Sequence, residues 1–384
     1  MRRRRQSQLQ SRLGHDYDRR GDLHLHRQRL RGARHHHRVD VLNGATISAN
    51  ANVAVAPATV GSIQFISPPS PPNIGLAGMG GPTSSKVTFE VNDINGNPVS
   101  GAAVSFALSS SFGGVTINPA SGTTDSAGQV FTFVQAGTQH TTVGVTATVV
   151  INGVTKHATS TSIIVSTGIP TENNFTMLIA KHNVESWHIG NVTDLVTLLL
   201  SDRFQTPVPD TTAVAVITDG GAIAPSSGVS TGGCSTTEGE CSVDWRSEEP
   251  WPDPVEHPDF TILGHAHIFA YTVGEESFND ANGDGVLDKG ETFYDIPEQF
   301  QDRNEDGTFH SSSPTDYYYD FNHNNSYDTA DGVWQGALCE DGAHCAAGSG
   351  SAASPTSTTT GVGVNGCIVM STSFANISLP SATT

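Results

Sequence analysis

Oxygen-bearing side chains recur at nearly every second position of the stretch 280–291, which has a glycine near its middle. When Asp280 is counted as position one, the ligand positions of an EF-hand-type calcium loop fall on Asp280, Asn282, Asp284, Val286, Asp288 and Glu291. Calcium takes about six to eight oxygens, so alternate side chains can surround it while position seven offers a backbone carbonyl and position twelve a closing carboxylate. Gly285 at position six permits the sharp turn. The stretch therefore predicts a calcium site.

The same pattern starts twice more downstream. The second copy offers Asp302, Asn304, Asp306 and Thr308, and the third offers Asp320, Asn322, Asn324, Ser326, Asp328 and Asp331. His310 and Ser313 occupy the ninth and twelfth positions of the second copy, so a ligand from elsewhere, with Asp316 as the candidate, has to complete it. Asn325 at the sixth position of the third copy tolerates a left-handed backbone better than most residues do.

The charge of this region favours a bound cation. Residues 275–331 hold fifteen Asp and Glu against Lys289 and Arg303, a net charge of 2 − 15 = −13. Without a cation such a segment repels itself and stays open. The alternative interpretation is a solvated acidic loop with Asn-Gly and Asp-Gly turns. We expect Ca²⁺ to be the cofactor of the segment.

The five cysteines favour an oxidising compartment. The spacing predicts local disulfides between Cys234 and Cys241 and between Cys339 and Cys345, since neither pair has the spacing of a zinc site. Reduced thiols in a cytoplasmic protein are the alternative. Cys367 lies in an apolar stretch, which favours a buried thiol over an intermolecular bridge.

Other candidates for chemistry are weaker. His265 and His267 fall on one face of a predicted strand, but a zinc enzyme needs a third ligand and a base, and the sequence marks neither. Two partly exposed strand histidines are therefore favoured. No G-x-S-x-G, H-E-x-x-H or P-loop sequence occurs, so we predict no enzyme and no catalytic residue. The aromatic residues of 316–321 could stack on a sugar, although packing between neighbouring loops is favoured.

Length and charge narrow the class of protein. The 384 residues leave room for two or three domains, and no apolar run of about 18 residues, the length of a transmembrane helix, occurs. Residues 1–40 carry twelve Arg and four Asp, a net +8, so residues 41–384 carry −27 and make a poor partner for nucleic acid. We expect residues 1–40 to be an out-of-frame or truncated reading of a preceding strand-rich module, with a signal sequence further upstream.

Two copies of one strand-rich module must position these residues. Residues 60–168 alternate apolar and polar side chains between Gly, Asn and Pro turns, a pattern typical of a β-sandwich. The same frame returns about 109 residues later, where 202–216 aligns with 93–106. An apolar strand at 366–377 follows the acidic segment, which is therefore expected as an insertion between the last two strands of the second sandwich.

The stretches DINGNPVSGAAVSF, TTDSAGQV and STGIPTENNF resemble the bacterial Ig-like modules of the invasin and intimin type, over roughly residues 60–380. The resemblance implies tandem sandwiches on a bacterial surface, acting as a stalk or adhesin arm with further modules upstream. The acidic run resembles the calcium loops of thrombospondin type 3 repeats and dockerins more than a helical EF-hand, because a strand precedes it.

These observations together predict an all-β chain of tandem immunoglobulin-like β-sandwiches. The expected parts are an irregular basic head with the remnant of a preceding module at 1–58, a first sandwich at 59–168, and a second at 169–384 with a calcium-binding insertion at 275–345. We expect a non-enzymatic surface or secreted structural protein stiffened by calcium. The alternative is a calcium-dependent module that binds a glycan or a protein of a host or neighbouring cell. A hydrolase is disfavoured because no set of nucleophile, base and orienting residue is marked.

Overall fold

The computed structural model describes residues 15–17, 23–25, 34–42, 45–53, 60–79, 81–151, 153–225, 232–312, 315–351 and 357–372. Within these ranges the chain forms strands and no α-helix, apart from the 3-10 turns η1(Phe112–Gly114) and η2(Glu172–Asn174). The all-β prediction is confirmed. Over the same ranges no helix is long and apolar enough to cross a bilayer.

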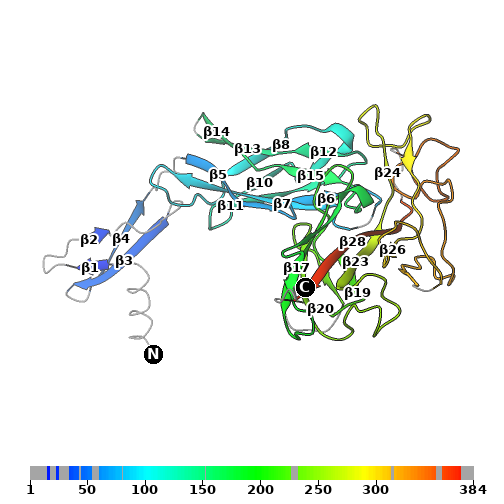
Figure 1. The fold of residues 1–384 in the computed structure, drawn as a ribbon. Coiled ribbons are helices and arrows are strands. Elements are labelled where there is room, and N and C mark those ends of the chain that lie inside the picture. Colours follow the sequence, from blue (N-terminus) through cyan, green and yellow to red (C-terminus); the bar gives the residue numbers. More distant parts are fainter. Residues whose placement is uncertain are drawn as a thin grey trace, which may run out of the picture.

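The region expected as an irregular head contains two antiparallel strand pairs. β1(His15–Tyr17) pairs with β2(Leu23–Leu25), and β3(Arg34–Leu42) pairs with β4(Ala45–Val53). The second pair precedes the first sandwich along the chain (Figure 1).

Residues 60–166 form the first sandwich, named sandwich 1. One sheet has the order β5(Val60–Ser70), β7(Ser84–Asp93), β11(Gln129–Gln135), β9(Thr116–Asn118). The facing sheets have the orders β10(Ser121–Thr123), β8(Ala103–Leu108), β13(Val145–Ile151), β14(Val154–Thr159) and β12(Thr141–Val143), β15(Ile163–Ser166), β6(Asn73–Gly75). Alternate side chains along β8 and β11 are buried, as the period of two in the sequence predicts. Phe89, Leu76 and Ile163 are fully buried in the core.

The second sandwich, named sandwich 2, comprises residues 175–274 and the last strand of the chain that the structure describes. One sheet has the order β16(Phe175–Ile179), β18(Thr193–Leu200), β22(Glu240–Arg246), β20(Ala222–Pro225). The other has the order β17(Asn183–Glu185), β28(Thr360–Ser371), β23(His265–Gly274), β19(Ala213–Thr218), β21(Gly233–Ser235). Trp245, Leu198 and Ile268 are buried between the two sheets.

The predicted repeat is visible in a turn that both sandwiches share. In sandwich 1 the amides of Asn95 and Asn97 donate to Asp93 Oδ1 at 2.8 and 2.9 Å. In sandwich 2 the amides of Phe204 and Thr206 donate to Asp202 Oδ1, both at 3.0 Å. The aligned residues thus adopt the same Asx-type turn, in which a short carboxylate caps the backbone two and four residues on.

Residues 275–359, named the insertion, connect β23 to β28, which pair antiparallel along their whole length. The insertion therefore lies between the last two strands of sandwich 2, as predicted; β28 begins at Thr360, six residues before the strand expected at 366–377, and residues 373–377 lie outside the described ranges. It contains the short strands β24(Ser277–Phe278), β25(Phe293–Tyr294), β26(Phe300–Gln301) and β27(Tyr317–Tyr318). Figure 1 shows the insertion in yellow to orange beside β23 and β28.

Candidate functional site

The first acidic loop has a hydrogen-bonded frame that turns its side-chain oxygens inward. Asp280 accepts from the amides of Gly283 at 2.6 Å and Gly285 at 2.8 Å, and Asp284 Oδ1 accepts from the amide of Val286 at 2.9 Å. Both glycines have positive φ, at 78° and 76°, which an L side chain adopts at a cost. The loop thus has the turn that calcium ligation through alternate residues requires.

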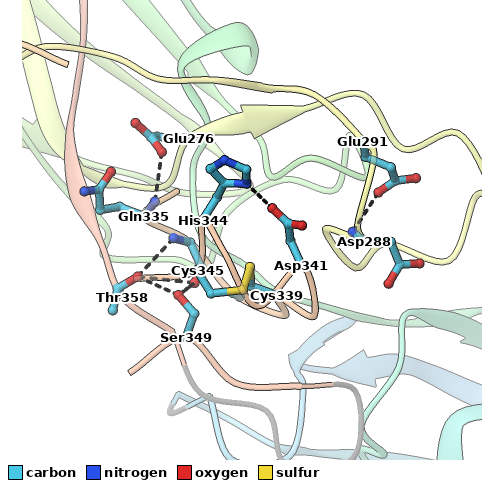
Figure 2. Close-up of a disulfide and its surroundings, with 12 residues drawn as sticks. Glu276, Asp288, Glu291, Gln335, Cys339, Asp341, His344, Cys345, Ser349 and Thr358 are labelled. Atoms are coloured by element: carbon cyan, nitrogen blue, oxygen red, sulfur yellow. Dashed lines mark hydrogen bonds and ion pairs between the residues drawn. A yellow bond between two sulfur atoms is a disulfide. The ribbon is translucent and has the colours of Figure 1, made fainter. Parts of the chain in front are cut away.

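A single carboxylate ties the two ends of this loop together. Glu291 Oε1 accepts from the amide of Ala281 at 2.8 Å, and Oε2 accepts from the amide of Asp288 at 3.0 Å. Figure 2 shows the second of these contacts. Asn282 Nδ2 donates to Asp288 Oδ2 at 2.9 Å across the loop. Asn282 and Glu291 therefore each connect separate parts of the loop, and Glu291 bonds amides near both of its ends.

The second loop has the same frame and takes its closing carboxylate from outside its twelve positions. Asp302 Oδ2 accepts from the amide of Gly307 at 2.8 Å. Asp316, which is buried, accepts from the amide of Arg303 at 3.0 Å and from that of His310 at 2.8 Å. Glu291 makes the corresponding contacts in the first loop, so Asp316, the candidate named from the sequence, occupies the equivalent place in the second loop. The other predicted ligands lie on the same turn: Asn304, Asp306 and Thr308.

The third loop begins in the same way. Asp320 accepts from the amides of Asn324 at 3.0 Å and Asn325 at 2.9 Å, and Asn324 Oδ1 accepts from the amide of Ser326 at 2.7 Å. Asn325 has φ of 60°, the left-handed backbone expected at position six. Asn322 Oδ1 also accepts from the Asn324 amide at 3.0 Å, so the predicted oxygens of positions one, three and five face the same turn.

The closing carboxylate of the third loop is Glu298 and not Asp331. Glu298 Oε1 accepts from the amide of Phe321 at 2.9 Å, and Oε2 accepts from the amide of Asp328 at 3.1 Å. Asp331 instead accepts from the amide of Val333 at 2.8 Å, because the chain after Asp328 turns away from the third loop. The twelve-position spacing therefore predicts Asp331 at position twelve, whereas in the structure Glu298 makes the corresponding contacts.

A fourth arrangement repeats these contacts with three separate segments of the chain. Glu276 accepts from the amides of Ile296 at 2.9 Å and Gln335 at 2.8 Å, and Asp295 accepts from the amides of Asp331 and Gly332. Figure 2 shows the contact between Glu276 and Gln335. Burial raises the pKa of Glu276 to about 8; the amides of Ile296 and Gln335 oppose this rise, and the charges of Asp295 and Asp331 add smaller increases. Sequence analysis missed this arrangement because a spacing rule finds only continuous loops.

The insertion also packs against sandwich 1. Val286, Ala337 and Leu338 are buried in the same apolar cluster as the core of sandwich 1. A Cβ on Gly285 would lie 2.4 Å from Cζ of Phe204, so the turn of the first loop touches that ring directly. The first loop therefore lies where the two sandwiches meet, a location that we name the junction.

An ion pair is buried at the junction. Arg203 Nη1 lies 3.5 Å from Glu275 Oε2 and donates to the carbonyl of Ala337 at 2.9 Å. Glu275 Oε2 also accepts from the Ala337 amide at 2.9 Å. The guanidinium carbon of Arg203 lies 5.4 Å from the ring centre of Phe278 and 5.8 Å from that of Trp334. Burial raises the pKa of Glu275 to about 7 although Arg203 opposes the shift. These contacts join sandwich 2 to both ends of the insertion.

The linker between the sandwiches is held by the turn at Asp202. Asp202 Oδ2 accepts from the hydroxyl of Ser166, from the hydroxyl of Thr167 at 3.3 Å and from the amide of Gly168 at 3.1 Å. Asp202 is fully buried, so its carboxylate depends on these donors in place of water. The linker is thereby fastened to the turn that also carries Arg203 and Phe204.

Both predicted disulfides are present: Cys234 with Cys241 and Cys339 with Cys345. Figure 2 shows the second of them, in the insertion. Cys367 is a free, partly buried thiol, and burial raises its pKa to about 12. The aromatic residues of 316–321 pack against neighbouring rings, with the ring of Tyr318 5.4 Å from that of Phe309, as the favoured alternative expected.

Comparisons with known proteins concern the fold. No family model matches the sequence, and a search of curated proteins finds no match. Solved structures similar to this chain include the D0-D1 domain of Intimin, with 16% identity over 55% of this chain and 90% of that chain and a TM-score of 0.24. The Escherichia coli adhesin FdeC has 18% identity over 60% of this chain and 66% of that chain, with a TM-score of 0.26. InvD of Yersinia pseudotuberculosis has 16% identity over 68% of this chain and 66% of that chain, with a TM-score of 0.26. Similarity at this level carries no argument about activity or partner.

Proposed function

We propose that this chain is a non-enzymatic structural arm of a bacterial surface or secreted protein, in which calcium bound by the insertion stiffens the junction between two Ig-like sandwiches. One residue carries the argument. Val286 occupies the position whose backbone carbonyl ligates calcium in loops of this type, and its side chain is 3% exposed within the core cluster of sandwich 1. Ordering the loop around an ion therefore also orders a contact between domains.

The insertion has the oxygens that such binding requires. Calcium supplies positive charge and a demand for several oxygen ligands. The first loop would hold it with Asp280, Asn282, Asp284, Glu291 and the carbonyl of Val286, with Asp288 as a direct or water-linked ligand. Asp316 and Glu298 would close the second and third loops, and Glu276 with Asp295 and Asp331 would serve the split arrangement. Paired with these carboxylates, the ion offsets a local charge of −13, which is 2 − 15 over residues 275–331.

The setting of the arm follows from the disulfides and the charge. Disulfides form and persist in oxidising environments, which favours a cell-surface or secreted location. The net charge of −27 on residues 41–384 disfavours nucleic acid as a partner. A surface protein of a host or neighbouring cell is the class of partner that an adhesive arm would contact, and further Ig-like modules would extend the arm.

A calcium-dependent binding module is the second candidate. Tyr294 and Tyr317 of the insertion are 59% and 46% exposed, and exposed tyrosines can stack on a sugar or bury against a protein. A glycan array probed with and without calcium tests it: calcium-dependent binding that Tyr294→Ala and Tyr317→Ala abolish would support this candidate over a purely structural arm.

Hydrogen exchange and calorimetry test the stiffening proposal. The protein is stripped with EDTA, the chelator is removed, and Ca²⁺ is returned to about 100 times its dissociation constant, which stabilises a binding unit by about 2.7 kcal/mol. We expect protection to rise in residues 280–291 and also in residues 202–206, which contain no predicted ligand. Asp280→Ala should remove both effects at the junction and leave the second and third loops protected.

Asp125→Ala is the matched control, because Asp125 caps an exposed turn of sandwich 1 through the amides of Ala127 and Gln129. It should bind calcium like the unaltered chain. Absence of binding heat at millimolar calcium would refute calcium binding. Protection confined to residues 280–291, with 202–206 unchanged, would refute the stiffening while leaving calcium binding intact.

A further inference from the structure

Four side chains of metal-binding type converge on the face of sandwich 2 that the insertion covers. They are His265 and His267 of β23, Cys367 of β28 and Glu305 of the second acidic loop, and their ligand atoms all lie within 4.8 Å of one another. Strand pairing accounts for three of them, because His267 is directly opposite Cys367 and His265 is two residues along the same face.

The second acidic loop supplies the fourth side chain. Glu305 has φ of 59°, in the left-handed region, at the same loop position where the first loop has Gly283. Its Oε1 lies 2.8 Å from His265 Nδ1 and 3.3 Å from His267 Nε2. The loop is also fastened beside the histidines, since Gln301 Nε2 donates to the His267 carbonyl at 2.9 Å.

A buried carboxylate orients His267. Asp219 Oδ2 lies 2.8 Å from His267 Nδ1, and Asp219 Oδ1 accepts from the His267 amide at 2.7 Å. Both side chains are at most 4% exposed. Nδ1–H donates to Asp219, so in the neutral imidazole Nε2 is an acceptor. Nε2 of His267 then faces the carboxylate of Glu305, which is also an acceptor. Two acceptors that face each other require a proton or a cation between them.

We propose that His265, His267, Glu305 and Cys367 form a four-coordinate site for a divalent transition metal, with Zn²⁺ as the ion that the ligands fit. Two imidazoles, a thiolate and a carboxylate suit zinc, whereas calcium and magnesium take oxygen ligands. The carboxylate of Asp219 behind His267 is the outer contact that zinc-binding histidines usually make. Four protein ligands leave no open position for a reacting water, so the site is structural.

The metal would connect the insertion to the sandwich. Three ligands belong to the sheet and Glu305 lies between Asn304 and Asp306, so one ion would pin the second acidic loop onto β23 and β28. None of the four ligands is a predicted calcium ligand, so binding at the zinc site and binding at the calcium loops can be measured separately.

Cobalt titration of the full chain with its disulfides intact tests the proposal. Co²⁺ reports a tetrahedral site by its visible absorption and a thiolate ligand by a charge-transfer band in the near ultraviolet. Cys367 is the one cysteine outside a disulfide, all five being among the described residues, so that band can come only from this site and not from histidines near the N-terminus. We expect both signals to saturate at one equivalent, to persist in excess Ca²⁺ and to disappear when Zn²⁺ is added.

Variants of three of the four residues assign the signals to the site. Cys367→Ser should remove the charge-transfer band, and His267→Ala should weaken Co²⁺ binding at least about tenfold. Glu305→Gln should weaken binding similarly without a folding defect, because Glu305 is partly exposed. His157→Ala in β14 is the matched control and should change nothing. Absence of the thiolate band in the folded, unaltered chain, or a band that Glu305→Gln and His267→Ala both leave unchanged, would overturn the proposal.

Discussion

The two sandwiches share a frame and differ in how one pair of strands is connected. In sandwich 1, β13 and β14 are joined at residues 152–153, whereas in sandwich 2 the corresponding strands β23 and β28 are joined by residues 275–359. The longer connection leaves the pairing intact because β19 and β17 hold the two strands from outside. It also has a small core of its own around Leu287 and Trp334. A module can thus hold a large inserted segment without a change in the order of its strands.

The shared Asx-type turn shows a second difference. Asp93 is half-buried, and its second oxygen accepts from Asn97 Nδ2 at 3.2 Å. Asp202 makes the same turn with one oxygen and holds the linker with the other. The turn is a local property of the chain, whereas its use as a joint depends on which domain lies next to it.

Removing calcium should give the largest contrast between the two sandwiches. We expect protease cleavage within 275–359 to rise sharply in chelator, because the unscreened acidic segment opens, while residues 60–166 stay resistant. Limited proteolysis with mass mapping measures it. After chelation, calcium is returned to one sample and zinc to another. We expect resistance to cleavage to recover in the calcium sample and not in the zinc sample. Equal cleavage in chelator and calcium would contradict the expectation.

Breaking the buried ion pair should have the next largest effect. Arg203→Met removes the charge that opposes the rise in the pKa of Glu275, so the buried carboxyl must stay unpaired or take up a proton, and the variant should lose about 3–5 kcal/mol of unfolding free energy. Arg246→Met removes an exposed pair with Glu248 at 2.7 Å and should cost at most about 1 kcal/mol. Urea denaturation of both variants measures the difference, and equal costs would show that the junction pair contributes no more than a surface pair.

The two disulfides should stabilise different parts of the chain. Replacing Cys339 and Cys345 by Ser should lower the stability of the insertion by about 2–3 kcal/mol, the loop entropy of a short closed loop. Replacing Cys234 and Cys241 should lower that of sandwich 2 by a similar amount. Hydrogen exchange locates each loss. If either double variant destabilised only the other region, the assignment of the disulfides to separate units would be wrong.

The paired turns provide a smaller and more specific test. Asp202→Asn removes the charge that five donors share and should cost about 1.5–3 kcal/mol, whereas Asp93→Asn should cost at most about 0.5 kcal/mol. Thermal unfolding of the two variants measures both losses, and hydrogen exchange shows whether the linker residues lose protection. Similar losses in the two variants would remove the distinction between a free turn and a joint.

Acidification should have the smallest effect. His140 of sandwich 1 stacks on Phe204 with ring centres 4.0 Å apart, and burial lowers its pKa below the ordinary value of 6.5. As pH falls below 6.5 the unfolded chain binds a proton that the folded chain does not, so stability is lost between 6.5 and the lowered pKa. Only the contribution of His140 should be absent in His140→Gln, so the difference in unfolding free energy between this variant and the unaltered chain should change over this range; a constant difference would assign the effect to other groups.

The sequence by itself determined the features that depend on near neighbours. The alternation of apolar and polar residues with a period of two predicts the strands. The Asx-type turns repeat because Asp93 and Asp202 cap amides two and four residues on. The disulfides close short loops. Positions one to nine of the first acidic loop are set in the same way, since each side chain bonds an amide a few residues along the chain. Such contacts are encoded by spacing and can be found without a fold.

The tertiary structure alone decided which distant groups complete each site. Glu298 closes the third acidic loop from a position upstream of it, and Cys367 reaches the histidines of β23 only because β28 pairs beside them. Val286 became part of the core of sandwich 1 through the path of the insertion back to the junction. Spacing along the sequence cannot predict these contacts, because the type of a residue does not identify the distant partner that folding brings next to it.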